Sequence, residues 1–239
     1  MAERLSNLLP HLVSDEQCVV QKGKIISANI GLASELANLL HTSVRGSGMG
    51  IKVDVQKVYD TMSWDFLFAV LKKFGFSDVW LGWIYEILVS SRILVLFNGG
   101  PIGFIDVERE LRQGDPISPI LFILAEEVLC RGLNGLLNEG KIKALPGPRG
   151  AKVPTHLLFA DDIFIFLNAT AKHVKCLREF LHKYQLFSGK KFNLEKSKIF
   201  FGKVALHRKR FIADLIGIPS CALPTKYLEV EILRRCQKG

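Results

Sequence analysis

The chain has 239 residues, of which 49% are hydrophobic, and its mean hydropathy is +0.22. This length suits one sizeable domain or two small ones, and the composition excludes a disordered chain. No apolar run approaches the about 18 residues that span a bilayer, and the N-terminus lacks the basic and then apolar layout of a signal peptide. We therefore expect an intracellular protein without a membrane segment, in the nucleus or the cytoplasm.

The charge is strongly basic, with a formal net charge of +9 and a pI near 9.4. Such a balance favours a polyanionic partner, because each phosphate that Lys or Arg neutralises releases counterions. The basic residues are densest in four stretches, 141–143, 190–191, 196–198 and 203–210. The five cysteines form no Cys-x-x-Cys pair and their number is odd, which disfavours a disulfide framework or a zinc site.

The first third of the chain predicts helices around one strand. A helix is expected over 27–41 and a strand over 51–55, with the Gly-rich segment 45–50 between them. Two helices follow near 65–74 and 77–91, and Ser63 or Asp65 can cap the first while Gly75 ends it. Asp54 lies near the end of the strand, where a carboxylate is either a cap or a functional acid.

The middle of the chain predicts a hairpin, a rigid loop and a long helix. Strands over 93–97 and 102–107 are joined by the turn sequence 98–101, Asn-Gly-Gly-Pro. The loop 112–116 then opens an apolar helix over 117–137. With its glycine, its polar residues and Pro116, and with Pro119 in the first turn of the helix, this loop is either a specific binding loop or a helix entrance that Asp115 caps.

An adjacent pair of acids, Asp161 and Asp162, lies between the apolar runs 157–160 and 163–166. Runs rich in aromatic and branched residues are typical of strands, so the pair is expected at the tight turn of a β-hairpin. One interpretation is a plain polar turn. The other is a functional site, because neighbouring carboxylates repel each other unless they are solvated or face a cation.

The last third predicts a helix over 171–187 that Gly189 ends, a strand near 198–201, a basic helix over 207–216 and a short strand over 227–232. Strands and helices are thus interspersed with hairpins. We predict an α+β fold with helices on one face of the sheet.

Three segments together resemble the reverse transcriptase domain of non-LTR (LINE-type) retroelements, most closely the plant kind. They are Asp54-x-x-Lys57-x-Tyr59-Asp60, the segment 112–119 (Arg-Gln-Gly-Asp-Pro-Ile-Ser-Pro), and 159–162 (Phe-Ala-Asp-Asp). The family's fourth motif is similar to Gly189 and 193–197, and its fifth, the primer grip, to 224–228. The resemblance covers nearly the whole chain, with the motifs in order.

The resemblance implies a polymerase palm, an antiparallel sheet backed by helices, with partial fingers. Residues 1–50 correspond to part of the fingers, 51–232 to the palm with the primer grip, and 233–239 to the tail of a truncated fragment. A group II intron-type maturase shares the Ala-Asp-Asp core, but the segment 112–122 argues against it.

The implied activity is RNA-directed DNA polymerisation, with an RNA template, a DNA primer and deoxynucleoside triphosphates. Asp54, Asp161 and Asp162 are expected to bind two Mg²⁺ ions, or Mn²⁺. Hard oxygen ligands suit such ions, and two of them about 4 Å apart stabilise both the attacking and the leaving oxygen of phosphoryl transfer. Bound cations also resolve the repulsion between the paired carboxylates.

The resemblance also assigns residues to the nucleotide site. Tyr59 is expected under the incoming sugar, where its ring excludes a 2′-hydroxyl, and Gln113 and Gly114 are expected to line the pocket. Lys196 is expected near the leaving pyrophosphate as a general acid or as a neutralising charge. The alternatives are an ordinary strand-end aromatic for Tyr59 and a solvated lysine for Lys196.

Template and primer contacts are implied for Arg112, Pro116, Tyr227 and Leu228. Tyr227 and Leu228 would also suit the edge of a core. Several positions depart from the family pattern: Lys24 replaces an arginine, Ala28 an aspartate, Glu110 and Glu229 glycines, and Glu231 a proline. A second hypothesis is therefore a catalytically inactive remnant with at most weak nucleic-acid binding.

Overall fold

The computed structural model describes residues 1–17, 25–42, 48–57, 59–90, 92–106, 111–228 and 230–232. Three positions singled out in the sequence, Lys24, Glu110 and Glu229, lie outside the described residues, as does the segment 233–239.

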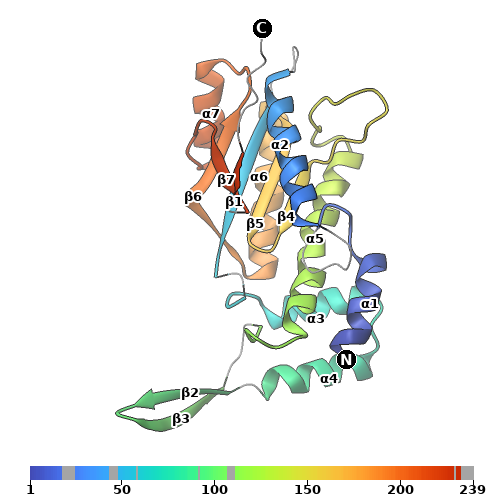
Figure 1. The fold of residues 1–239 in the computed structure, drawn as a ribbon, viewed down its shortest axis with the longest axis vertical. Helices are drawn as coiled ribbons and strands as arrows, with labels where there is room; N and C mark the ends of the chain where they lie inside the picture. Colours follow the sequence, from blue (N-terminus) through green and yellow to red (C-terminus); the bar gives the residue numbers. More distant parts are fainter. Residues whose placement is uncertain are drawn as a thin grey trace.

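A four-stranded antiparallel sheet forms the centre of the fold (Figure 1). Its strand order is β4 (His156–Phe159), β5 (Asp162–Asn168), β1 (Gly48–Gln56) and β6 (Lys191–Phe201). Burial alternates along β1, where four apolar side chains lie on one face. Gly50, Lys52 and Asp54 therefore share the other face, because successive side chains of a strand point to opposite sides.

One face of the sheet packs against α5 (Ser118–Asn138), α6 (Ala171–Ser188) and α7 (Leu206–Ile216). This core joins β1 residues such as Ile51 and Val53 to Leu129 and Leu133 of α5 and to Leu177 of α6. The sequence predicted α6 closely. Thr170 caps its start by accepting a hydrogen bond from the His173 N–H, and Gly189 ends it with a φ of 76°, as a glycine at a helix C-cap does.

The opposite face is covered by α2 (Ile26–Thr42) and by a hairpin of β7 (Thr225–Tyr227) and β8 (Val230–Ile232). Figure 1 shows α2 and α6 on opposite sides of the sheet. The expectation of helices on one face only was therefore incomplete, because Leu36 and Leu40 of α2 pack on Phe164 and Phe166. The predicted single strand over 227–232 is the hairpin β7–β8 instead.

A second core lies below the sheet in Figure 1, where α1 (Ala2–Leu12), α3 (Trp64–Lys73) and α4 (Asp78–Val89) pack around the start of α5. Ser63 caps α3, as one of the two predicted candidates, and Ser77 caps α4. The hairpin of β2 (Arg92–Phe97) and β3 (Gly100–Asp106) projects from this end of the molecule.

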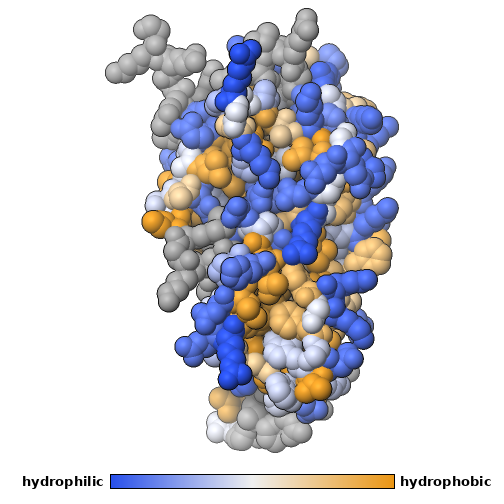
Figure 2. Space-filling model, turned by 90° about the vertical axis from the view of Figure 1, so that its right-hand side faces the viewer, coloured by the Kyte–Doolittle hydropathy of each residue, from blue (hydrophilic) through white to orange (hydrophobic). Residues whose placement is uncertain are grey.

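The surface on the side of α1 and α5 mixes apolar and hydrophilic side chains (Figure 2). Apolar residues gather in the lower half of this view, and hydrophilic side chains border them. Within the described part of the chain, no helix is both long and apolar enough to cross a membrane.

Candidate active site

Asp54 and Asp162 lie opposite each other at one end of the two central strands, β1 and β5. Asp54 lies near the end of β1, and the antiparallel register places Asp162, the first residue of β5, directly opposite it. Side chains of directly opposite residues lie on the same face. Both carboxylates are partly exposed. The fold thus unites two acids from the distant first and third sequence motifs.

Asp161 occupies the turn between β4 and β5 and is exposed. Phe159 pairs with Asp162, so the turn has two residues, Ala160 and Asp161. The predicted turn is confirmed for Asp161, whereas Asp162 already belongs to the strand. Ala160 has a φ of 52°, a left-handed conformation that costs a non-glycine residue about 1 kcal/mol. Such strain is common at functional turns.

Lys52 pairs with one of the three acids. Its Nζ lies 2.7 Å from Asp162 Oδ1 and donates a hydrogen bond of 2.9 Å to the Lys226 carbonyl. The Leu228 N–H donates to Asp162 Oδ2 at 3.4 Å. Asp162 is therefore tied through Lys52 and Leu228 to the β7–β8 hairpin. Sequence reasoning assigned no role to Lys52, although its position two residues before Asp54 places both on one face.

A bulge in β6 supports the end of β1. Lys52 pairs with Lys198 and Asp54 with Asn193, so β6 carries extra residues between these two pairs. Ser197 fills the irregularity: its hydroxyl accepts from the Asp54 N–H at 3.0 Å and donates to the Asn193 carbonyl at 2.6 Å. Lys196 is exposed on this bulge, and its N–H bonds Asn193 Oδ1.

Tyr59 and the loop 111–116 lie side by side. The Leu111 N–H donates to the Tyr59 carbonyl at 3.0 Å, which joins the first and second motifs. Arg112, Gln113 and Pro116 are exposed, and Gly114 has a φ of 90° that favours glycine. The alternative role of Asp115 as a cap is also realised, because its Oδ1 accepts from the Ile117 N–H at 2.9 Å.

The Tyr59 ring packs on a buried aromatic side chain. It packs against Phe122 of α5 with 5.1 Å between ring centroids, and the Lys190 ammonium lies 4.2 Å from the Phe122 centroid. Lys190 is 1% exposed and forms an ion pair with the equally buried Glu126, which also accepts from the Tyr184 hydroxyl at 2.8 Å. Burial raises the pKa of Tyr59, and the charge of Asp161 adds to this rise.

Tyr227 is fully buried and meets Phe164 edge-on, with 5.1 Å between the ring centroids. Its side chain thus belongs to the core, in keeping with the alternative interpretation. Leu228 is partly exposed and has a φ of 49°.

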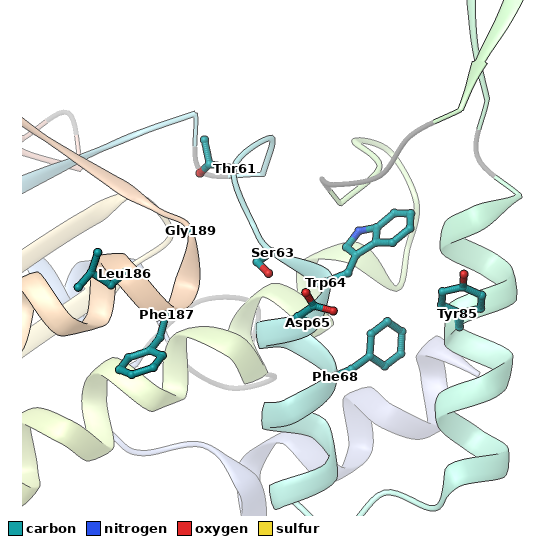
Figure 3. Close-up of a pocket in the computed structure, with 9 residues that line it drawn as sticks. All are labelled: Thr61, Ser63, Trp64, Asp65, Phe68, Tyr85, Leu186, Phe187 and Gly189. Atoms are coloured by element: carbon teal, nitrogen blue, oxygen red, sulfur yellow. The ribbon is translucent and has the colours of Figure 1, made fainter.

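A separate cavity of about 390 Å³ lies between α3, α4 and the end of α6 (Figure 3). Trp64, Asp65 and Phe68 of α3 face Tyr85 of α4, with Leu186 and Phe187 on the other side. None of the site residues predicted from the sequence lines it.

The carboxylates have the right chemistry for a hard divalent cation, but they do not converge into a preformed cage. Across the described ranges, no group of three or more His, Cys, Asp or Glu side chains lies close enough together to hold a metal ion. The Lys52 ammonium already neutralises Asp162. An ion bound by all three acids would share the Asp162 carboxylate with Lys52 or displace the ammonium group from it.

Comparison with known proteins agrees with this geometry. The model of the family described as reverse transcriptase (RNA-dependent DNA polymerase) matches residues 1–232. An uncharacterized mitochondrial protein of Arabidopsis thaliana is 33% identical over 113 residues, 46% of this chain and 88% of that protein.

Two further relatives come from mobile elements. A retrovirus-related Pol polyprotein from the type-1 retrotransposable element R2 of Popillia japonica is 28% identical over 48% of this chain, and the transposon TX1 149 kDa protein of Xenopus laevis is 28% identical over 56%. The matches span only 18% and 10% of those proteins. These relatives confirm the resemblance to non-LTR retroelement proteins.

Solved structures share the fold. Apo telomerase of Candida tropicalis superposes with a TM-score of 0.61 at 15% identity, over 86% of this chain and 41% of that one. Telomerase of Candida albicans, in complex with a telomeric RNA fragment, gives a TM-score of 0.53 at 14% identity, over 85% and 33%. These likenesses confirm a palm-type polymerase fold with an antiparallel sheet backed by helices.

Proposed function

Because the chain belongs to the reverse transcriptase (RNA-dependent DNA polymerase) family, we propose that it extends a DNA primer with deoxynucleotides on an RNA template. The observation that supports this proposal most is the register of β1 and β5, which pairs Asp54 with Asp162 beside the exposed turn residue Asp161. Only a fold that joins the first and third motifs can use these acids as one centre.

Asp54, Asp161 and Asp162 would hold divalent cations, Mg²⁺ or Mn²⁺, through their carboxylate oxygens. Such ions supply charge stabilisation to the attacking and leaving oxygens of phosphoryl transfer. Asp161 is free to approach because it is exposed in the turn. Asp162 would be the third ligand, and the Lys52 ammonium group would compete with the ion for its carboxylate.

Tyr59 would contact the sugar of the incoming nucleotide. Its ring packs against Phe122, and Phe122 in turn contacts the Lys190 ammonium group of the buried Lys190–Glu126 pair. The Tyr59 ring would therefore be unable to move aside for a 2′-hydroxyl. Gln113 and Gly114 would line the same pocket, since the Leu111 N–H bonds the Tyr59 carbonyl. Arg112 and Pro116, exposed on the same loop, would face the template.

Lys196 would neutralise the leaving pyrophosphate or donate a proton to it. Its place supports this role, because the β6 bulge that carries it is bonded to the Asp54 N–H through Ser197. The backbone of the β7–β8 hairpin, with Leu228 bonded to Asp162, would position the primer end.

Nucleic-acid binding without catalysis is the second candidate. The Lys52–Asp162 ion pair supports it, because a carboxylate that a lysine neutralises has less attraction for a metal ion. In this case the basic surface would bind RNA or DNA through its phosphates alone.

Primer extension on an RNA template with Mg²⁺ separates the two candidates. We expect extension by the wild type and none by Asp161→Ala/Asp162→Ala. The control Asp78→Ala/Asp214→Ala removes two exposed acids far from the site and should extend normally. Extension that survives the Asp161/Asp162 substitutions would overturn the assignment. Salt-sensitive RNA binding by a wild type that does not extend would establish the second candidate.

A further inference from the structure

A cavity beside Asp54 is lined by four lysines. It has a volume of about 350 Å³ and lies between β1, β6 and the β7–β8 hairpin. The lysines come from all three parts: Lys52 from β1, Lys196 and Lys198 from β6, and Lys226 from β7. Asp54, Glu231, Pro224 and Thr225 also line the cavity.

The register of the strands brings like charges together. Lys52 and Lys198 lie directly opposite each other in the β1–β6 ladder. Like charges in directly opposite positions destabilise a sheet unless an anion compensates them. Lys52 has such an anion in Asp162, at 2.7 Å. Lys198 is exposed and forms no ion pair with any residue that the structure describes.

The remaining charges leave the cavity positive. Lys226 lies opposite Glu231 across the β7–β8 hairpin, so these two side chains have opposite charges in facing positions. Among the described residues of the wall, Asp54 is then the acid that remains for Lys196 and Lys198. If Asp54 binds a cation, its charge is no longer available to them. The described residues of the wall therefore carry more positive than negative charge.

We propose that this cavity binds phosphate groups, with Lys198 and Lys226 as residues that hold them. Lysine is a compact point charge that suits phosphate oxygens and needs no bidentate geometry. The phosphates can come from the backbone of a nucleic-acid strand or from a free polyphosphate. The inference extends the proposed function but does not depend on it, because phosphate binding here requires neither a metal ion nor turnover.

The first test compares two lysine pairs. Lys198→Gln/Lys226→Gln removes two charges from the cavity wall, and Lys172→Gln/Lys175→Gln removes two exposed charges from α6, on the other face of the sheet. Binding of a fluorescently labelled 12-nucleotide single strand is followed by anisotropy in EDTA over a series of salt concentrations. Binding of inorganic tripolyphosphate is measured by calorimetry under the same conditions.

We expect the cavity variant to lose about tenfold in affinity for at least one probe, and the α6 variant to lose much less. If the strand is the ligand, log K should depend less steeply on log salt in the cavity variant. The magnitude of the negative slope should decrease by about 1.4, or about 0.7 for each lost phosphate contact. Loss confined to tripolyphosphate would assign the cavity to a free polyphosphate. Equal losses in both variants for both probes, or no loss in either, would overturn the proposal.

A second test uses a substitution that should strengthen phosphate binding, whereas the first test weakens it. Asp162→Asn removes the partner of Lys52 and adds a free ammonium group to the cavity. The control Asp78→Asn removes an acid that is likewise paired with a lysine, Lys72, at 3.3 Å on the surface. In EDTA we expect about threefold tighter binding for Asp162→Asn and little change for Asp78→Asn. Equal behaviour of the two variants would contradict the site. Circular dichroism verifies that both are folded.

Discussion

Asp54 of β1 and Asp162 of β5 are cross-strand partners in the antiparallel sheet, and Lys52, two residues before Asp54, forms the ion pair with Asp162. The same strand thus supplies both an acid of the candidate metal site and the cation that neutralises its neighbour. Lys52 also bonds the Lys226 carbonyl, so this one side chain links the central sheet to the β7–β8 hairpin.

Substitution of Lys52 by glutamine should separate these effects. Without metal, the variant leaves a partly buried carboxylate unpaired, which should lower the free energy of unfolding by about 1–3 kcal/mol. Mn²⁺ should bind several-fold more tightly, because no ammonium group competes for Asp162. Urea unfolding in EDTA and a Mn²⁺ titration measure the two effects. Unchanged Mn²⁺ affinity would show that Lys52 and the ion do not compete.

Tyr59→Ala should relax the choice of sugar. Removal of the ring opens the space above Phe122, so incorporation of ribonucleotides relative to deoxynucleotides should rise about tenfold or more. The matched control is Tyr85→Ala, an exposed tyrosine of α4. Single-nucleotide extension with each type of nucleotide gives the ratio. A ratio that stays at the wild-type value would remove Tyr59 from the sugar site.

Lys190→Met should be strongly destabilising. The substitution leaves Glu126 buried without its cation, and the loss of one partner of a buried pair typically costs about 3–5 kcal/mol. Lys191→Met changes the exposed neighbour and should cost little. The double variant Lys190→Met/Glu126→Gln should recover part of the loss. Urea denaturation compares the four proteins, and equal stability of Lys190→Met and Lys191→Met would contradict the buried ion pair.

The stability of the fold should depend on pH through His156. Burial lowers the pKa of this histidine from 6.5 to about 4. Between these values the unfolded chain binds a proton that the folded chain does not, so stability is present above about pH 6.5 and is lost as the pH falls toward 4. The shift corresponds to about 3 kcal/mol.

Urea midpoints measured from pH 7.5 to 4.5 test this dependence. His156→Leu should flatten the curve, whereas His182→Leu, at an exposed position of α6, should retain it. Curves of equal steepness for wild type and His156→Leu would assign the pH dependence to other groups.

Local signals in the sequence predicted most of the secondary structure. Hydrophobic periodicity, the cap at Ser63 and the stop at Gly189 lie within a few residues of what they determine. The β4–β5 hairpin was also predicted, because an Asp-Asp pair between two apolar runs is typical of a tight turn between strands. The family motifs then grouped Asp54 with this hairpin.

Features that depend on tertiary packing could not be read in this way. Lys190 counted among the basic stretches, yet it is buried while its neighbour Lys191 is exposed, because Glu126 and Phe122 of a distant helix surround it. The pairing of Lys52 with Asp162 and the burial of Tyr227 likewise require the strand register and the β7–β8 hairpin.

The proposed metal centre can be tested by metal binding alone, because this measurement requires no template, primer or turnover. Mn²⁺ is titrated into the wild type, Asp54→Asn, Asp161→Asn and the control Asp78→Asn, and free Mn²⁺ is followed by electron paramagnetic resonance. We expect binding by the wild type and by Asp78→Asn, and at least about tenfold weaker binding by each of the other two variants. Mn²⁺ affinity that is the same in all four proteins would contradict a metal centre at the junction of β1 and the β4–β5 hairpin.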